Sequence, residues 1–183
     1  PLPLATNMKS MYEKERAKSL SHFTFGISVD CVVFGFDGSD VKVLVIKRGT
    51  EPYKDFQAIP GDLVHEKEDP IDATKRVLNE LTGLKDIYLE QLKAFAGVNR
   101  HPLGRVVTLA YYSLIKIEDY NPKPSSWAID ATWTSIQDIR EMAFDHFEIF
   151  TSALKRLQER VSIRPIGFEI LPKKFTLAKL QYL

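Results

Sequence analysis

The stretch GDLVHEKEDPIDATKRVLNELTGL occupies residues 61–84 and holds the clearest local structure signals of the chain. Asp69 can cap a helix, and Pro70 suits the first helical position. Apolar or small side chains then recur at helical spacing, and the residues on this face are Ile71, Thr74, Leu78 and Leu81. Gly83 follows where a helix would end. The stretch therefore predicts an amphipathic helix that begins at Pro70 and stops at Gly83.

Strand signals lie on both sides of this helix. SVDCVVFGF (residues 28–36) and VKVLVIKR (residues 41–48) are rich in β-branched and aromatic residues, and Asp37-Gly38 between them predicts a hairpin turn. YLEQLKAFAGV (residues 88–98) and RVVTLAYYSLIKI (residues 105–117) predict two long strands separated by the polar NRHPLG. WAIDATWTS (residues 127–135) predicts a short strand whose Trp127 and Trp133 belong to the core.

A loop and a second helix complete the pattern. Residues 51–61 contain Pro52, Pro60 and Gly61 and are typical of a loop. Residues 145–160 predict a helix, and Asp145 with Glu148 resembles a capping box. Its apolar stripe comprises Phe147, Phe150, Leu154, Leu157 and Val161.

The composition excludes several classes of protein. The chain has 183 residues, of which 44% are apolar and 27% charged, and its net charge is +1. These values are typical of a globular protein and give no electrostatic footprint for nucleic acid within this segment. The single cysteine, Cys31, forms neither an internal disulfide nor a zinc site, which fits a cytoplasmic setting. Because no run of 18 apolar residues exists, we expect no transmembrane helix.

Residues 62–84 resemble the Nudix box of hydrolases that act on nucleoside diphosphates linked to another group. That box reads Gly, any five, Glu, any seven, then Arg-Glu-apolar-any-Glu-Glu-any-Gly-apolar. Asp62 stands in place of the first Gly, and the matching residues are Glu68, Arg76, Glu80, Gly83 and Leu84. Val77 and Leu81 stand where two of the three helix glutamates belong.

The loss of two acids bears directly on catalysis. Mg²⁺ needs several hard oxygen ligands, and the glutamates of an intact box hold it against a pyrophosphate. Val77 and Leu81 lie four residues apart, so we expect an adjacent aliphatic patch on the helix surface that cannot hold a cation. We therefore predict no catalytic residue and no metal site. Glu68 is expected to bond Arg76 in a structural role.

Three further stretches resemble Nudix-related transcriptional regulators of the NrtR/AraR type: RVLNELTGL, AFDHFEIF and PIGFEILPKKFTLAKLQYL. The resemblance implies an α/β Nudix fold, a mixed sheet sandwiched between helices, followed by the start of a winged helix. It divides the chain into an extension (residues 1–23, with 1–7 a foreign remnant or extension), an effector-binding domain (residues 24–162) and a linker with the first winged-helix element (residues 163–183). The last helix stops at Leu183 without a cap, so we expect the natural chain to continue.

The resemblance also implies partners. The expected effector is a sugar or a nucleotide-linked sugar, for example a pentose or ADP-ribose, and operator DNA would bind through the missing C-terminal domain. A homodimer is expected as well. The alternatives are a divergent MutT-type hydrolase of nucleoside diphosphate-linked substrates, for which Mg²⁺ would be the cofactor, and a bare dimerisation module.

Candidate ligand-binding residues lie on loops around the box. Arginine suits a bidentate grip on phosphate or carboxylate, and Arg100 in NRHPLGR belongs either to a pocket or to a charged turn. His146 is either a ligand contact or a satisfied structural histidine, Tyr53 and Phe56 either stack on a ligand or pack a lid, and His101 is expected to be exposed. The predicted binding set is Arg48, Gln57, Asp62, Arg76, Glu80, Asn99, Arg105 and His146.

Overall fold

The computed structural model describes residues 25–163 and confirms the predicted hairpin. β1 (Gly26–Phe36) and β2 (Val41–Arg48) run antiparallel. Gly38 has a φ of 96°, a left-handed conformation that favours glycine. The Asp37 carboxylate accepts hydrogen bonds from the backbone N–H groups of Ser39 and Asp40, so the predicted DG turn is held by its own side chain.

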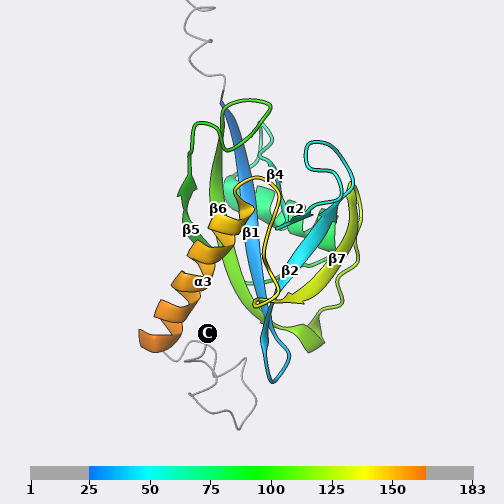
Figure 1. The fold of residues 1–183 in the computed structure, drawn as a ribbon, viewed down its shortest axis with the longest axis vertical. Helices are drawn as coiled ribbons and strands as arrows, with labels where there is room; N and C mark the ends of the chain where they lie inside the picture. Colours follow the sequence, from blue (N-terminus) through cyan, green and yellow to red (C-terminus); the bar gives the residue numbers. More distant parts are fainter. Residues whose placement is uncertain (1–24, 164–183) are drawn as a thin grey trace, which may run out of the picture.

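Seven strands form one mixed sheet, in the order β3-β2-β1-β6-β5, with β4 beside β1 and β7 beside β2 (Figure 1). β1 is parallel to β6, and every other pairing is antiparallel. The remaining strands are β3 (Gln57–Ala58), β4 (Gly61–Leu63), β5 (Glu90–Phe95), β6 (Val106–Lys116) and β7 (Ala128–Ser135), and a short 3-10 helix, η2 (Ile117–Asp119), follows β6. The predicted strand at residues 88–98 is therefore shorter, and the predicted loop at residues 51–61 contains β3 and the first residue of β4.

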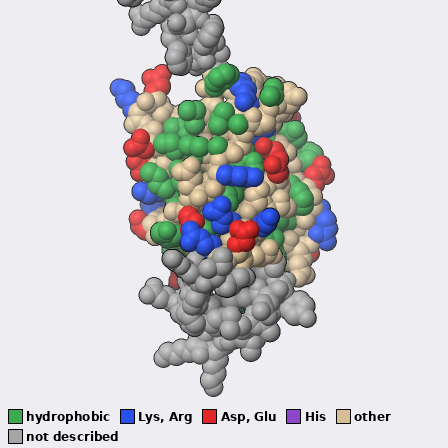
Figure 2. Space-filling view, turned by 90° about the vertical axis from the view of Figure 1, so that its left-hand side faces the viewer, with side chains coloured by type: hydrophobic (Ala, Val, Ile, Leu, Met, Phe, Trp, Pro, Cys, Tyr) green, Lys and Arg blue, Asp and Glu red, His purple; other side chains and the backbone are tan. Residues whose placement is uncertain are grey.

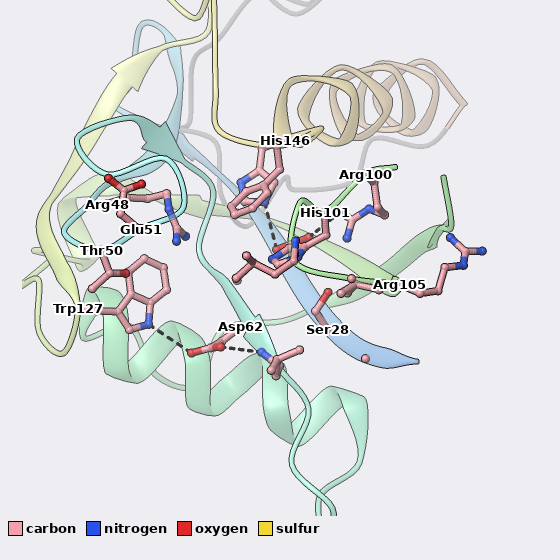
Figure 3. A pocket seen from close by; sticks show the side chains of 18 residues that line it. Ser28, Arg48, Thr50, Glu51, Asp62, Arg100, His101, Arg105, Trp127 and His146 are labelled. Atoms are coloured by element: carbon pink, nitrogen blue, oxygen red, sulfur yellow. Dashed lines mark hydrogen bonds and ion pairs between the residues drawn. The ribbon is translucent and has the colours of Figure 1, made fainter. Parts of the chain in front are cut away.

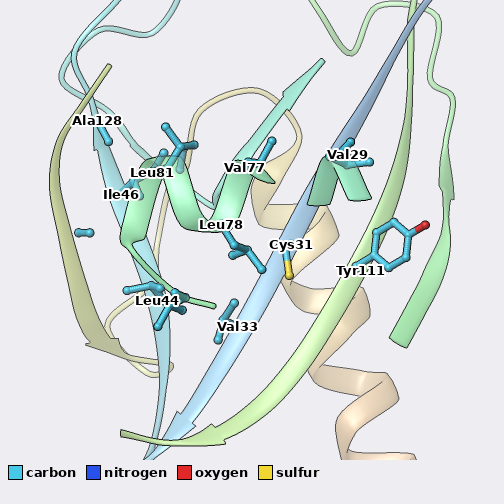
Figure 4. Packing of buried hydrophobic residues seen from close by; sticks show 14 of the residues in the cluster. Val29, Cys31, Val33, Leu44, Ile46, Val77, Leu78, Leu81, Tyr111 and Ala128 are labelled. Carbon is cyan, nitrogen blue, oxygen red and sulfur yellow. The ribbon is translucent and has the colours of Figure 1, made fainter. Parts of the chain in front are cut away.

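α2 (Pro70–Thr82) occupies the predicted helix position and covers one face of the sheet. Gly83 ends it with a φ of 75° and donates its N–H to the Asn79 carbonyl. Asp69 occupies the cap position but makes no side-chain cap bond, so that part of the prediction is wrong. Leucine and valine side chains of α2 interdigitate with those of β1 and β2 (Figure 4).

α3 (His146–Ile163) covers the opposite face, which confirms the sheet sandwiched between helices. Its predicted stripe needs one correction, because Phe147 is 41% exposed. The buried apolar residues of the helix are Ile149, Phe150, Ala153 and Leu157, and His146 at its start is buried as well. The predicted capping box is also wrong, because the Asp145 carboxylate bonds the Arg100 side chain instead.

The side of the molecule formed by β5 and α3 carries neighbouring basic and acidic side chains, which Figure 2 shows over its lower half. Glu90 on β5 pairs there with Arg160 and lies 4.0 Å from Arg156 of α3. Within residues 25–163, no helix is both long and apolar enough to span a membrane. The predicted extension, linker and winged-helix start lie outside the described residues, as does the Val161 side chain.

Candidate functional site

A cavity of about 590 Å³ lies where β1 and β2 separate. β1 pairs with β2 only over Phe34–Phe36, whereas its earlier residues Ser28–Asp30 pair with β4. The two long strands thus diverge, and their separated ends pair with different short strands, β1 with β4 and β2 with β3. Figure 3 shows side chains from β1, β2, β4 and α3 and from neighbouring loops converging on the cavity. The cavity wall is therefore built from several elements and loops rather than from a single loop.

Asp30 and His146 lie together in the cavity wall, and both are buried. The Ile59 N–H donates to His146 Nδ1 at 3.2 Å, so the neutral imidazole carries its proton on Nε2. That nitrogen lies 3.6 Å from Asp30 Oδ1. Burial lowers the pKa of His146 to about 3 and raises the pKa of Asp30 to about 6, although Arg100 partly opposes the second effect.

The Gly61 backbone lies directly against the Asp30 carboxylate. A Cβ at position 61 would lie 1.8 Å from Asp30 Oδ1, so only glycine leaves room for the buried acid. Asp30 and Gly61 are partners in the β1–β4 register, which explains the contact. Gly61 therefore belongs to the site through its lack of a side chain.

Arg100 lies in the cavity wall, where its side chain is 5% exposed and connects several neighbouring groups. Its Nε and Nη2 bond the two carboxylate oxygens of Asp145 at 2.8 and 2.6 Å, and Nη1 bonds the Thr108 hydroxyl at 2.6 Å. Nη2 also lies 3.5 Å from Asp30 Oδ2. Because these partners occupy its donors, Arg100 holds the loop of residues 96–105 to the start of α3 instead of presenting a free guanidinium to a ligand.

Arg48 lies between two aromatic rings. Its guanidinium carbon is 4.8 Å from the centre of the Trp127 ring and 4.9 Å from that of Phe144. Nε donates to the Pro52 carbonyl at 2.9 Å, and burial lowers the pKa of Arg48. Trp127 in turn donates its indole N–H to Asp62 at 3.3 Å. Arg48 is thus a positioned cation in the wall, with two rings fixing its plane.

Phe144 joins this group to neighbouring aromatic side chains. Its φ of 55° is unusual for a residue with a side chain. The ring stacks on His101 at 5.1 Å and lies 4.7 Å from Tyr53 and 5.2 Å from His146. His101 was expected to be exposed, and this contact with its partial burial is a correction. Tyr53 also packs edge-on against Phe56, so these two rings contact one another, and neither side chain is part of the cavity wall.

The structure brings half of the predicted binding set into the cavity wall: Arg48, Asp62, Arg105 and His146. Arg105 lies at one end, and its guanidinium points away from the other labelled side chains (Figure 3). Its Nη1 donates to the carbonyls of Ala96 and Gly97 at 2.8 Å each. The residues outside the wall are Gln57, Arg76, Glu80 and Asn99.

Arg76 and Glu80 form part of a network outside the cavity. Arg76 bonds both oxygens of Glu68 at 2.9 and 2.5 Å, and it also reaches Glu80 at 3.2 Å and the Leu63 carbonyl at 2.9 Å. These hydrogen bonds lower the pKa of Glu68 to about 2. The predicted structural role of Glu68 is confirmed. Arg76 and Glu80, both in the predicted binding set, instead form an i,i+4 pair outside the cavity wall, and the network ties α2 to the preceding loop.

Val77 and Leu81 are buried in the core, each 1% exposed. They belong to the cluster that contains Val29, Leu44 and Ile46, and Figure 4 shows them directed toward the sheet. The expected surface patch is therefore wrong. Among the described residues, no group of three or more His, Cys, Asp or Glu side chains could hold a metal ion. The donor set of α2 consequently does not fit a Mg²⁺ site of the box type.

Asp30 and Phe144 are the principal site residues that the sequence prediction missed. A signal for Asp30 was present, because a charged residue interrupts the apolar run SVDCVVFGF, and a buried acid there is unusual. Ser28, Asp30, Val32 and Phe34 share one side of β1, which places the acid next to the α3 face. Phe144 gave no comparable signal, since its role depends on a backbone conformation.

The comparisons with known proteins agree on one family. A family model described as "NUDIX domain" matches residues 24–153. The ADPR responsive transcriptional repressor NtrR of Acinetobacter baylyi is 29% identical over 159 residues, which cover 85% of this chain and 63% of the repressor. The chain therefore spans less than two thirds of that relative. The ADP-ribose pyrophosphatase of Methanocaldococcus jannaschii is 25% identical over 140 residues, covering 76% of this chain and 82% of the enzyme.

Solved structures agree with these relatives. The NUDIX domain of Shewanella oneidensis NrtR, complexed with ADP ribose, aligns with a TM-score of 0.67 and 28% identity over 72% of this chain and 87% of that chain. Shewanella oneidensis NrtR complexed with a 27mer DNA aligns with a TM-score of 0.72 and 27% identity over 85% of this chain and 73% of that chain.

Proposed function

The chain belongs to the Nudix family, and from this premise we propose that its domain is the effector-binding part of a transcriptional regulator with little or no hydrolase activity. The effector would be a sugar or a nucleotide-linked sugar, such as a pentose or ADP-ribose. The burial of Val77 and Leu81 carries the proposal. A cavity is retained beside a helix whose metal-binding positions have become core, which suits binding without phosphoryl chemistry.

The relatives support this proposal. One of them is named an ADPR responsive transcriptional repressor, and a second regulator was solved with ADP ribose and with DNA. By analogy, effector would bind in the cavity of this chain, and operator DNA would bind a C-terminal part. Because operators are commonly two-fold symmetric, we further propose that the protein acts as a cytoplasmic homodimer.

A second candidate function is that of a divergent hydrolase. It is favoured by the similarity to an ADP-ribose pyrophosphatase and by Glu80, which keeps one of the three helix acids. Glu80 has a half-exposed side chain that bonds Arg76 and lies outside the cavity wall. Hydrolysis would therefore need metal ligands from a different set of residues.

One pair of measurements separates the two functions. The chain is incubated with ADP-ribose and Mg²⁺ or Mn²⁺ while AMP release is followed, and calorimetry measures ADP-ribose and pentose binding without metal. We expect saturable binding of at least one probe and turnover far below about 1 per second, the low end of ordinary enzymes. Turnover at or above that rate favours the hydrolase, and the absence of any binding contradicts the effector domain.

A further inference from the structure

The Asp30 carboxylate is buried in the cavity wall, where the Thr108 hydroxyl and Arg100 are its hydrogen-bonding neighbours. The side chain lies 3.5 Å from Arg100 Nη2 and 3.6 Å from His146 Nε2, and the residue is 4% exposed. Both distances exceed the roughly 2.7–2.9 Å of a charge-assisted hydrogen bond. A carboxylate has about four acceptor sites, so these partners leave capacity for a further donor that would stabilise the buried charge. Since Asp30 lines the cavity, a bound ligand can supply that donor.

The neighbouring charges leave Asp30 unbalanced. Arg100 is already matched by Asp145, whose two oxygens it holds in a bidentate pair. His146 is neutral, because burial keeps its pKa far below that of a free histidine. An ionised Asp30 therefore adds a negative charge that the protein compensates only weakly. A ligand group that adds to these partners must therefore donate hydrogen bonds.

The rest of the wall restricts the charge of that ligand group. Three arginines, Arg48, Arg100 and Arg105, line the cavity and disfavour a cationic ligand. Three acids, Asp30, Glu51 and Asp62, disfavour a phosphate near Asp30. A neutral hydroxyl avoids both penalties. A pair of adjacent hydroxyls can donate to Asp30 and accept from the Nε2 proton of His146.

We propose that Asp30 and His146 form a subsite for adjacent hydroxyl groups of a sugar ring. Asp30 accepts a hydrogen bond from one hydroxyl, and His146 donates one to its neighbour. Asp30 is thereby the residue that distinguishes a hydroxylated ring from a deoxygenated one. This inference rests on the proposed function and deepens it, because it names the part of the effector that the cavity recognises.

The test removes the hydroxyl and the acid in turn. Calorimetry on the 183-residue chain compares free aldopentoses, ribose 5-phosphate and ADP-ribose, and then each monodeoxy analogue of the tightest probe. In the wild type, at least one analogue should bind about tenfold or more weakly, as expected for a hydrogen bond to a charged group. In Asp30→Ala the same analogue and its parent should bind within about twofold of each other, because the acceptor is absent.

Two controls keep the test independent of folding. Asp30→Asn keeps the side-chain shape and removes the charge, so its parent affinity should fall about tenfold while its circular dichroism matches the wild type. Asp130→Asn removes an exposed acid on β7 that accepts from the Ala131 N–H, and its affinities should be unchanged. The subsite is overturned if each analogue loses the same affinity relative to its parent in the wild type and in Asp30→Ala. That result would leave the proposed function intact. If no probe binds the wild type, both are overturned.

Discussion

At the scale of single residues, Asp30 and His146 have opposite proton linkages. The pKa of Asp30 rises from 3.8 to about 6 on folding, because burial disfavours its charged form. The pKa of His146 falls from 6.5 to about 3 for the same reason. Between about pH 4 and 6 the folded protein holds the Asp30 proton that the unfolded chain releases, and it lacks the His146 proton that the unfolded chain binds. The two contributions to the pH dependence therefore oppose each other.

Single substitutions should expose each contribution. Asp30 makes stability fall as pH rises from about 4 to 6, so the unfolding free energy of Asp30→Asn relative to the wild type should increase across that window. His146 makes stability rise over the same window, so the relative value for His146→Asn should decrease. Each change should be on the order of 2–3 kcal/mol. Urea unfolding at pH 4.5, 5.5 and 6.5 measures the differences, and parallel curves for variant and wild type would refute the assignment.

Val77 and Leu81 also allow a test at this scale. The double substitution Val77→Glu/Leu81→Glu restores the motif glutamates, but it places two carboxylates at core positions that are each 1% exposed. We expect a loss of at least about 3–5 kcal/mol in unfolding free energy, the usual cost of an uncompensated buried charge. The measurement is urea unfolding, with calorimetric titration of Mn²⁺ beside it.

Asn79→Glu is the matched control, because position 79 is exposed on the same helix. Its stability should stay within about 0.5 kcal/mol of the wild type. A double variant with wild-type stability and a new Mn²⁺ site would mean that the helix can turn these positions toward the cavity. That outcome would contradict the burial on which the proposed function depends.

At the scale of elements, the Arg100–Asp145 pair fixes the start of α3. Replacing Asp145 leaves Arg100 close to a second acid, Asp30, at 3.5 Å. Replacing Arg100 leaves the buried Asp30 and the partly buried Asp145 without the cation that both contact. We therefore expect Arg100→Met to cost about 3–5 kcal/mol and Asp145→Asn clearly less. Thermal or urea unfolding gives the order of the two.

The control for this pair is Lys75→Met, which removes a cation from an exposed pair with Asp72. A surface pair contributes little, so the change should be below about 1 kcal/mol. Equal losses for Arg100→Met and Asp145→Asn would show that Asp30 does not share Arg100 in the folded protein.

The elements themselves were largely predictable, because their signals are local. Pro70 and Gly83 mark the ends of α2, and Asp37-Gly38 marks the hairpin turn, within a few residues in each case. Asp145 shows where local reasoning fails. It satisfied a helix-capping pattern, yet its carboxylate bonds Arg100, 45 residues away in the sequence. The capping pattern depends on neighbouring residues only, whereas the observed ion pair forms between side chains that come together only in the assembled fold.

The candidate site was predictable only in part for the same reason. The motif identified the positions of Val77 and Leu81 but not that both point into the core. Arg48 ends β2, Asp62 lies within β4, Arg105 precedes β6 and His146 begins α3, and these positions place all four in the cavity wall. Arg76 and Glu80 lie outside the wall, because Glu68 holds Arg76 on the outer side of α2.

At the scale of the whole molecule, the cavity joins parts of the chain that are far apart in sequence. β1, β4, β6 and the start of α3 all contribute to its wall. A ligand that binds only the folded state stabilises it by about 2.7 kcal/mol at a concentration of 100 times Kd. For a chain of this length, that energy corresponds to a rise in Tm of very roughly 5–10 °C.

Saturating ADP-ribose, or a pentose that binds, should also protect specific amides. We expect slower hydrogen exchange at the Ile59 amide, which bonds His146, and at the Ile149 amide in the first turn of α3. Amides in the hairpin turn at residues 37–40 should serve as the internal control, since they lie outside the cavity wall. Uniform protection across the chain, including that turn, would instead indicate general stabilisation without a localised site.

α3 begins at His146 in the cavity wall and continues for 18 residues. At 1.5 Å per residue, its far end lies about 27 Å from the cavity. A rigid helix amplifies rotation in proportion to its length, so a tilt of about 5° at His146 would displace Ile163 by about 2 Å. The geometry thus gives this helix leverage, by which a change of a few tenths of an ångström around the first turn would become a movement of atomic size at the opposite end.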